Sequence, residues 1–147
     1  MSRSAVSAAP PSRKTVAVVG ASTDRRKFGN KGMRAFVAAG WRVFPVNPNE
    51  PAVEGLPTVA FVSDIAEPLD VVSLYVPPAV GLKLLPAIVE KQPRELWLNP
   101  GSESRALLAA AAELGLPVVQ TCSIIAVGYH PADFQERNGG FRRACTR

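Results

Sequence analysis

The chain has 147 residues, of which 47% are hydrophobic and 20% are charged. This length and composition predict one globular domain with a sizeable core and exclude an intrinsically disordered chain. No apolar run approaches the roughly 20 residues that cross a bilayer. The segment from Met1 to Arg13 has no apolar stretch of the kind that forms a secretory signal. We therefore expect a cytoplasmic protein.

The net charge of +5 belongs mostly to the two ends of the chain. Between Lys14 and Pro131 the sequence has 11 basic and 10 acidic side chains. This central part lacks the basic stripe with interleaved aromatic residues that is typical of nucleic-acid binding. We expect a leader at 1–13, one domain at 14–131 and a basic tail at 132–147, with no role for nucleic acid.

Short apolar runs alternate along the chain with segments of helical periodicity. The pattern predicts strands at 14–20, 41–46, 70–76, 95–98 and 116–120, and helices at 27–39, 79–91 and 103–114. A further short edge strand is expected at 56–59, and a helical turn at 63–66. Ser102 is the expected N-cap of the third helix, and Gly40 and Gly115 are expected to end helices. Together these elements predict an α/β fold: a doubly wound, mainly parallel Rossmann-like sheet of five to six strands, with helices on both faces.

Unusual loop residues follow the strands of this predicted sheet. In a parallel sheet the carboxyl ends of the strands meet at one edge, where ligands bind. The segments are Gly20-Ala21-Ser22, Asn47-Pro48-Asn49, Val76-Pro77-Pro78, Asn99-Pro100-Gly101 and Thr121-Cys122-Ser123. Any one of them could simply be a turn. The five together favour a ligand cleft.

The first of these segments has the features of a phosphate site. Gly20 allows a tight turn with amide groups directed at an anion, and the next helix adds its positive N-terminal end. Arg25, Arg26 and Lys27 bring cations to the same place, and Lys31 is a weaker candidate. The alternative is that these cations form only a solvated helix face.

A nicotinamide or flavin dinucleotide is the obvious ligand of such a sheet, but two details count against it. The Gly-x-Gly-x-x-Gly fingerprint is absent, and the next glycine after Gly20 is Gly29. The second strand ends in Asn47 and not in the acidic residue that holds an adenosine ribose. An NAD(P)-binding oxidoreductase with an atypical glycine turn stays open as the alternative.

Three segments carry a resemblance to a known family: Val18-Val19-Gly20-Ala21-Ser22, Pro45-Val46-Asn47-Pro48 and Leu96-Trp97-Leu98-Asn99-Pro100-Gly101. With Cys122 after the last strand, they resemble the stand-alone CoA-binding domain proteins. These are small relatives of the CoA-binding domain of succinyl-CoA synthetase and of ADP-forming acyl-CoA synthetases. The resemblance extends over residues 14–127.

The resemblance implies that coenzyme A or an acyl-CoA lies along this edge of the sheet. Gly20, Ala21 and Ser22 would contact the pyrophosphate, and Arg25, Arg26 or Lys27, with Lys31 as a weaker candidate, would meet the phosphates. Asn47, Pro48, Val76 and Pro77 would border the adenosine, and Asn99, Pro100 and Gly101 the pantetheine arm. The chain departs from the family pattern at Pro77-Pro78 and at Thr121.

Candidate catalytic and metal-binding residues are few. Cys122, Cys145 and the single histidine, His130, show no metal-ligand spacing and no catalytic arrangement. Cys122 is a small buried residue at a strand end or, alternatively, a thiol that meets the CoA thiol. The phosphohistidine and nucleotide-grasp modules of the synthetases do not fit in this chain. We expect binding without catalysis, with a second copy or a separate catalytic partner as candidate protein partners.

Overall fold

A computed structural model describes residues 13–135 of the chain. Its centre is a five-stranded parallel sheet in the order β2-β1-β5-β6-β7. The strands are β1 (Thr15–Val19), β2 (Arg42–Val46), β5 (Val71–Leu74), β6 (Glu95–Leu98) and β7 (Val118–Gln120). In β1, Val16, Ala17 and Val18 are fully buried, as expected for a strand covered on both faces.

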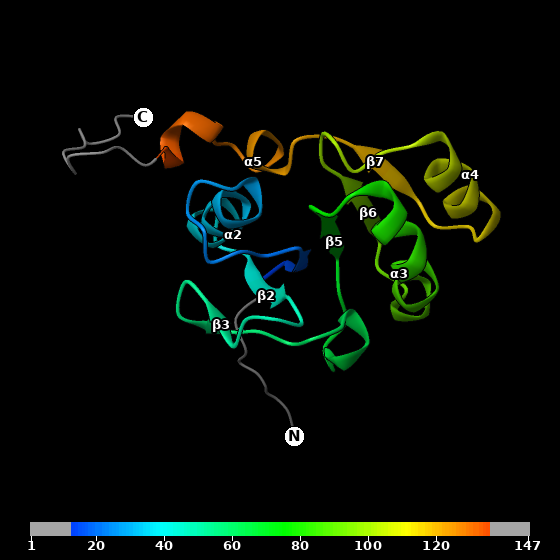
Figure 1. The fold of residues 1–147 in the computed structure, drawn as a ribbon, viewed down its shortest axis with the longest axis horizontal. Helices are drawn as coiled ribbons and strands as arrows, with labels where there is room; N and C mark the ends of the chain where they lie inside the picture. Colours follow the sequence, from blue (N-terminus) through cyan, green and yellow to red (C-terminus); the bar gives the residue numbers. More distant parts are fainter. Residues whose placement is uncertain (1–12, 136–147) are drawn as a thin grey trace, which may run out of the picture.

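Helices cover both faces of the sheet (Figure 1). The helix α2 (Phe28–Ala38) packs Met33 and Phe36 against one face. The helices α3 (Pro78–Lys91) and α4 (Arg105–Glu113) cover the other face. After β7, the short helix α5 (Ser123–Ala126) and the 3-10 turn η2 (Pro131–Phe134) pack against α2. The predicted α/β fold, doubly wound with a parallel Rossmann-like sheet, is confirmed.

The order of the strands reverses between β1 and β5. From β1 the chain crosses to β2 on one side, and it later returns to β5 on the other side of β1. In an open α/β sheet this switch point leaves a crevice beyond the carboxyl ends of the strands. The predicted site residues after β1 and β5 therefore flank this crevice.

The predicted edge strand at 56–59 is wrong in detail. Leu56–Pro57 forms β4, which pairs antiparallel with β3 (Ala52–Val53) in a separate hairpin. Only Val59 bridges to Val46 of β2, in parallel orientation. Pro45 and Pro57 each lack an N–H donor, and this keeps the pairing short. The predicted helical turn at 63–66 is the 3-10 turn η1 (Val62–Asp64).

The third helix begins later than predicted. Ser104, and not Ser102, caps α4, and its Oγ accepts the backbone N–H of Leu107 at 3.1 Å. The Ser102 hydroxyl instead lies within hydrogen-bond distance of the carbonyls of Leu74 and Val76, at 3.1 and 2.7 Å, and so holds the loop after β6 against β5.

The ends of the chain are only partly described. The leader predicted at 1–13 lies outside the described residues except for Arg13, and so does the predicted tail from residue 136. Residues 131–134, around the start of that tail, are the folded turn η2. Within 13–135, no helix combines the length and hydrophobicity needed to cross a bilayer.

Candidate functional site

The turn after β1 is tightly enclosed by its neighbours. Gly20 has a φ of +92°, and a Cβ atom there would lie 3.0 Å from the carbonyl oxygen of Tyr75. The start of α2 approaches the same turn, because a Cβ on Gly29 would lie 2.2 Å from the Gly20 carbonyl oxygen. Both positions need glycine for these close approaches. The N-terminus of α2 has no side-chain cap and no acidic residue in its first turn, so it keeps its positive end beside Gly20.

A pocket of about 260 Å³ opens beside this turn, at the carboxyl ends of β1 and β2. It is mostly apolar. Its lining includes Gly20, Asn47, Pro48 and Val76, which the sequence predicted for the site. This volume is at or just below the lower end of the range for small-molecule pockets, roughly 300 Å³ and above, so it suits part of a large ligand.

The lining residues that sequence reasoning missed include two exposed apolar side chains. Phe61, 54% exposed, follows the single parallel bridge at Val59, and Val80, 40% exposed, lies in the first turn of α3. The parallel bridge is the reason that Phe61 reaches this edge, because Val59 runs in the same direction as β2. An exposed aromatic residue just beyond a short apolar segment is the signal that could have revealed it.

Asn47 uses its side chain to join two loops. Its Nδ2 donates to the carbonyl of Ala21 at 2.7 Å, and its Oδ1 accepts the backbone N–H of Asn49 at 2.7 Å. The amide therefore sets the width of the crevice between the ends of β1 and β2. An aspartate would lack the donor to Ala21, which is a physical reason for a neutral residue at this position.

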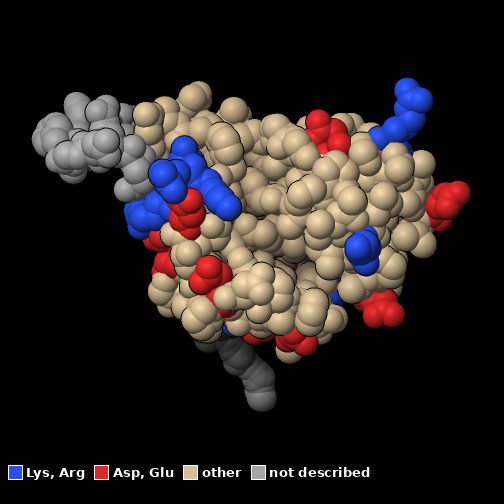
Figure 2. Space-filling model, in the orientation of Figure 1, with Lys and Arg blue, Asp and Glu red and all other residues tan. Residues whose placement is uncertain are grey.

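The cations after the turn are paired with acidic side chains of the same protein. Arg26 contacts Asp24 through Nε and Nη2, both at 3.0 Å, and Arg25 contacts Glu54 at 2.8 Å. Hydrogen bonds from Arg26 lower the pKa of Asp24 to about 2. Figure 2 accordingly shows blue and red side chains together over the start of α2. Both arginines at this end of α2 are therefore already paired with a carboxylate of the protein.

The two lysines of the predicted site are less constrained. Lys27 is the N-cap residue of α2 and is exposed. Lys31 lies one turn further along, with its Nζ 5.1 Å from the centre of the Phe28 ring. Both belong to the helix end that faces the turn.

The loops after β6 and β7 are held by a buried polar network. Asn99 is 2% exposed, and its Nδ2 donates to the Ser73 hydroxyl and to the Leu74 carbonyl, at 2.9 and 2.8 Å. Its Oδ1 accepts the N–H of Ser123 at 2.8 Å. The Asn99 amide thus bonds to the protein through both its nitrogen and its oxygen, and the exposed residues of this loop are Pro100 and Gly101.

Cys122 follows β7 directly and is the N-cap residue of α5. Its side chain is partly exposed and has no disulfide partner among residues 13–135. The carboxyl edge of the sheet thus carries the predicted residues in three groups: the pocket with the Gly20 turn, the cations at the start of α2, and the loops at Pro100, Gly101 and Cys122. Pro77, the N-cap residue of α3, lies between the first and third groups.

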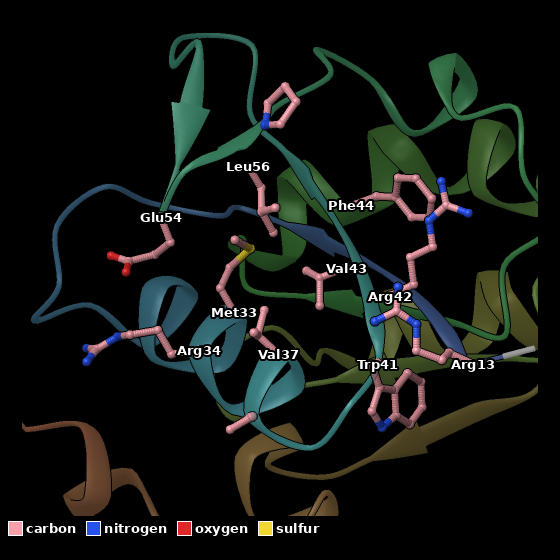
Figure 3. A pocket seen from close by; sticks show the side chains of 12 residues that line it. Arg13, Met33, Arg34, Val37, Trp41, Arg42, Val43, Phe44, Glu54 and Leu56 are labelled. Atoms are coloured by element: carbon pink, nitrogen blue, oxygen red, sulfur yellow. The ribbon is translucent and has the colours of Figure 1, made fainter.

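Two larger hollows lie away from this edge. One of about 920 Å³ is lined by Lys14, Asp70 and Glu95, which stand at the amino ends of strands. The other, of about 610 Å³, lies between α2, the outer edge of β2 and the β3–β4 hairpin (Figure 3). Neither touches the Gly20 turn, so we place the candidate site at the smaller pocket on the basis of the topology.

Comparison with protein families shows the family to which the chain belongs. Residues 14–128 match the family described as "CoA binding domain". The chain belongs to this CoA-binding family. No curated protein matched the sequence.

Solved structures include close relatives of this CoA-binding domain. A conserved hypothetical protein from Pyrococcus furiosus is 32% identical, with a TM-score of 0.71, over 78% of this chain and 98% of that chain. A Thermus thermophilus protein called cell-free ID.343 is 33% identical, with a TM-score of 0.71, over 77% of this chain and 87% of that chain. Both are proteins of similar size.

A third relative is part of an enzyme. The dinucleotide-forming acetyl-coenzyme A synthetase 1 of Ca. Korarchaeum cryptofilum, in complex with phosphate and ADP, is 26% identical, with a TM-score of 0.66, over 76% of this chain and 26% of that chain. The CoA-binding domain described here therefore corresponds to about a quarter of that synthetase.

Proposed function

We propose that the protein binds coenzyme A or an acyl-CoA along the carboxyl edge of its sheet and performs no chemistry of its own on it. The observation that carries this proposal is the enclosed Gly20 turn, which lies between the uncapped start of α2 and an apolar pocket at the switch point. A phosphate group suits the turn and the helix N-terminus, and a nucleobase suits the pocket.

The proposal assigns each part of the ligand to residues along this edge. The adenosine would occupy the pocket beside Asn47, Pro48 and Phe61. The pyrophosphate would lie against the backbone of Gly20 and Ala21. The pantetheine arm would then extend past Pro77 toward the loops at Gly101 and Cys122, which belong to neighbouring strands in the same sheet.

The proposal assigns no chemistry to His130, the single histidine of the chain. His130 is exposed, and its Nδ1 accepts the backbone N–H of Ala132, so this atom is used to cap η2. Within the described part of the chain no three His, Cys, Asp or Glu side chains cluster as metal ligands do. Any reaction of the bound ligand would then take place on a separate catalytic partner.

Calorimetric titration of the full-length protein tests the proposal. We expect CoA to bind at least about tenfold more tightly than NAD, because the pantetheine arm and the 3′-phosphate have no counterpart in NAD. A reducing agent keeps thiol–disulfide exchange at Cys122 from contributing. Equal affinity for both ligands would contradict the proposal and favour the NAD(P)-binding alternative.

A matched pair of variants tests whether the ligand occupies the pocket. Val80→Asp puts a carboxylate at the pocket wall and should weaken CoA binding by about tenfold, because it repels the phosphates and removes apolar contact. Val37→Asp is the control, since Val37 is also a helix valine, 50% exposed, but lines the hollow at the edge of β2. Equal affinity of the two variants would contradict the assignment of the pocket.

A further inference from the structure

The tip of the β3–β4 hairpin carries a glutamate in an unusual backbone conformation. Glu54 has a φ of +51° and the next residue, Gly55, has a φ of +80°. Two successive left-handed residues make the tight hairpin turn for which asparagine, aspartate and glycine are preferred. A glutamate is therefore a poor choice for the turn itself, and its side chain needs a separate explanation.

The Glu54 carboxylate lies against the loop that follows the Gly20 turn. Both of its oxygens accept from Nη1 of Arg25, at 2.8 and 3.0 Å. Its Oε2 also accepts from Nδ2 of Asn30 at 2.9 Å. The Glu54 side chain is 23% exposed and that of Arg25 is 47% exposed, so the pair is partly shielded from solvent.

Asn30 connects this ion pair to the turn. It is fully buried in the first turn of α2, and the same Nδ2 donates to the carbonyl of Ser22 at 2.9 Å. Its Oδ1 accepts from Nε of Arg34 at 2.7 Å. Figure 3 shows Glu54 and Arg34 directed to the same side, away from the apolar floor of the neighbouring hollow. The buried Asn30 amide thus connects the hairpin tip to the Gly20 turn.

We propose that Glu54 is an internal counter-ion that competes with the ligand's pyrophosphate for Arg25 and so sets the affinity of the site. The inference rests on the proposed function. A carboxylate and a phosphate accept from a guanidinium in the same geometry, and Arg25 cannot serve both fully. Binding then exchanges one ion pair for another and separates the hairpin tip from the loop.

This exchange has two measurable consequences. The Arg25–Glu54 ion pair is broken when the Arg25–pyrophosphate pair forms. Arg25 therefore adds little to the CoA affinity of the wild-type protein, and this affinity depends weakly on salt concentration. The hairpin, with residues 52–57, loses its contact with the loop when ligand binds. Its amide hydrogens should then exchange faster with solvent in the presence of CoA, while those of residues 20–24 should exchange more slowly.

The decisive comparison is Glu54→Gln against Glu50→Gln in the full-length protein. Each substitution removes one negative charge near the turn, and Glu50 contacts only Thr23 there, at 3.5 Å, and no arginine among the described residues. We expect Glu54→Gln to bind CoA about three- to fivefold more tightly than wild type, and Glu50→Gln to change affinity by less than about twofold. The gain should shrink between about 50 mM and about 300 mM salt.

Dephospho-CoA and the wild-type protein complete the test. The gain should persist with dephospho-CoA, because the pyrophosphate is common to both ligands, and a gain confined to CoA would overturn the assignment to the pyrophosphate. Equal affinity of the two variants, or weaker binding by Glu54→Gln, would overturn the competition. If Glu54→Gln does not fold, slower hydrogen exchange in the wild-type hairpin on CoA binding overturns it. Failure of wild type to bind CoA at all would instead overturn the proposed function.

Discussion

Tyr75, the first residue after β5, places its hydroxyl where no partner satisfies it. The Oη atom is buried and has no hydrogen bond of normal geometry among residues 13–135, although Ser73 and Ser123 lie nearby. Gly32 of α2 makes room for it, since a Cβ there would lie 2.2 Å from Oη. Burial is the main cause that raises the pKa of Tyr75 above its ordinary value of 10.0.

The raised pKa makes Tyr75 a source of alkaline instability. The folded protein favours the neutral phenol, so ionisation of Tyr75 costs no stability below its ordinary pKa of 10.0, and stability is lost progressively as the pH rises above that value. Tyr75→Phe keeps the ring and removes the buried hydroxyl, so we expect a free energy of unfolding higher by up to about 1 kcal/mol near neutral pH. The variant should also lose less stability than wild type between about pH 9 and about pH 11.

Urea unfolding near neutral pH, at about pH 9 and at about pH 11 measures both effects. Tyr129→Phe is the control, because the Tyr129 hydroxyl donates to the carbonyl of Ala38 at 3.3 Å and its loss should not stabilise the protein. A Tyr75→Phe variant less stable than wild type at neutral pH would contradict the prediction, because it would show that the Tyr75 hydroxyl makes a stabilising hydrogen bond.

At the scale of elements, the start of α2 lies very close to the Gly20 turn. Gly29 lies at the second position of α2, where alanine has the better helix propensity by up to about 1 kcal/mol. The added methyl would meet the Gly20 carbonyl oxygen at 2.2 Å, however, and backbone cannot yield as a flexible side chain can. We expect Gly29→Ala to lower the free energy of unfolding by about 1–3 kcal/mol and to weaken CoA binding severalfold.

Gly81→Ala is the matched control for this prediction. Gly81 is a buried glycine early in α3, and its added Cβ would meet only methyl groups of Leu107 and Leu74, at 3.3 Å. Helix propensity should therefore offset most of the crowding, and CoA affinity should not change. Thermal unfolding and calorimetry compare the stability and the CoA affinity of the two variants. A Gly29→Ala variant with unchanged stability and affinity would mean that α2 does not need to lie so close to the Gly20 turn.

The sequence predicted all five strands of the main sheet and the three long helices, with each end within two residues of its place in the structure. The strand β6 (Glu95–Leu98) and the helix α3 differ from their predicted ranges by at most one residue. The two-residue strands β3 and β4 and the four-residue helix α5 are too short to carry a period of 2 or 3.6, so the sequence could not reveal them.

The candidate site was likewise predicted only in part. The sequence predicted which loops meet at the carboxyl edge, because that follows from the order of strands and helices alone. It did not predict that Asn47 and Asn99 turn their amides inward or that Arg25 faces Glu54, since these contacts join residues 24 to 29 positions apart through the hairpin, the turn and the loops. Side-chain pairing between loops depends on tertiary structure that no local pattern encodes.

At the scale of the whole molecule, one buried amide joins three parts of the chain. Asn99 follows β6 and bonds to Ser73 and Leu74 in β5 and to Ser123 at the start of α5. The Ser73 and Ser123 hydroxyls lie 2.9 Å apart and complete the network, and both residues are fully buried. The network thus connects the centre of the sheet to the segment that packs on α2. Its loss should therefore lower the free energy of global unfolding.

Asn99→Ala should therefore lower the free energy of unfolding by about 2–4 kcal/mol, because the N–H of Ser123 and the Leu74 carbonyl would each lose a buried partner. Asn49→Ala, at an exposed position on the same edge, should stay within about 0.5 kcal/mol of wild type. Urea unfolding measures the free energy of unfolding of both variants. An unchanged slope of that free energy against urea concentration would show that only the folded state was destabilised. If Asn99→Ala were as stable as Asn49→Ala but bound CoA poorly, the amide would act on the ligand and not on the fold.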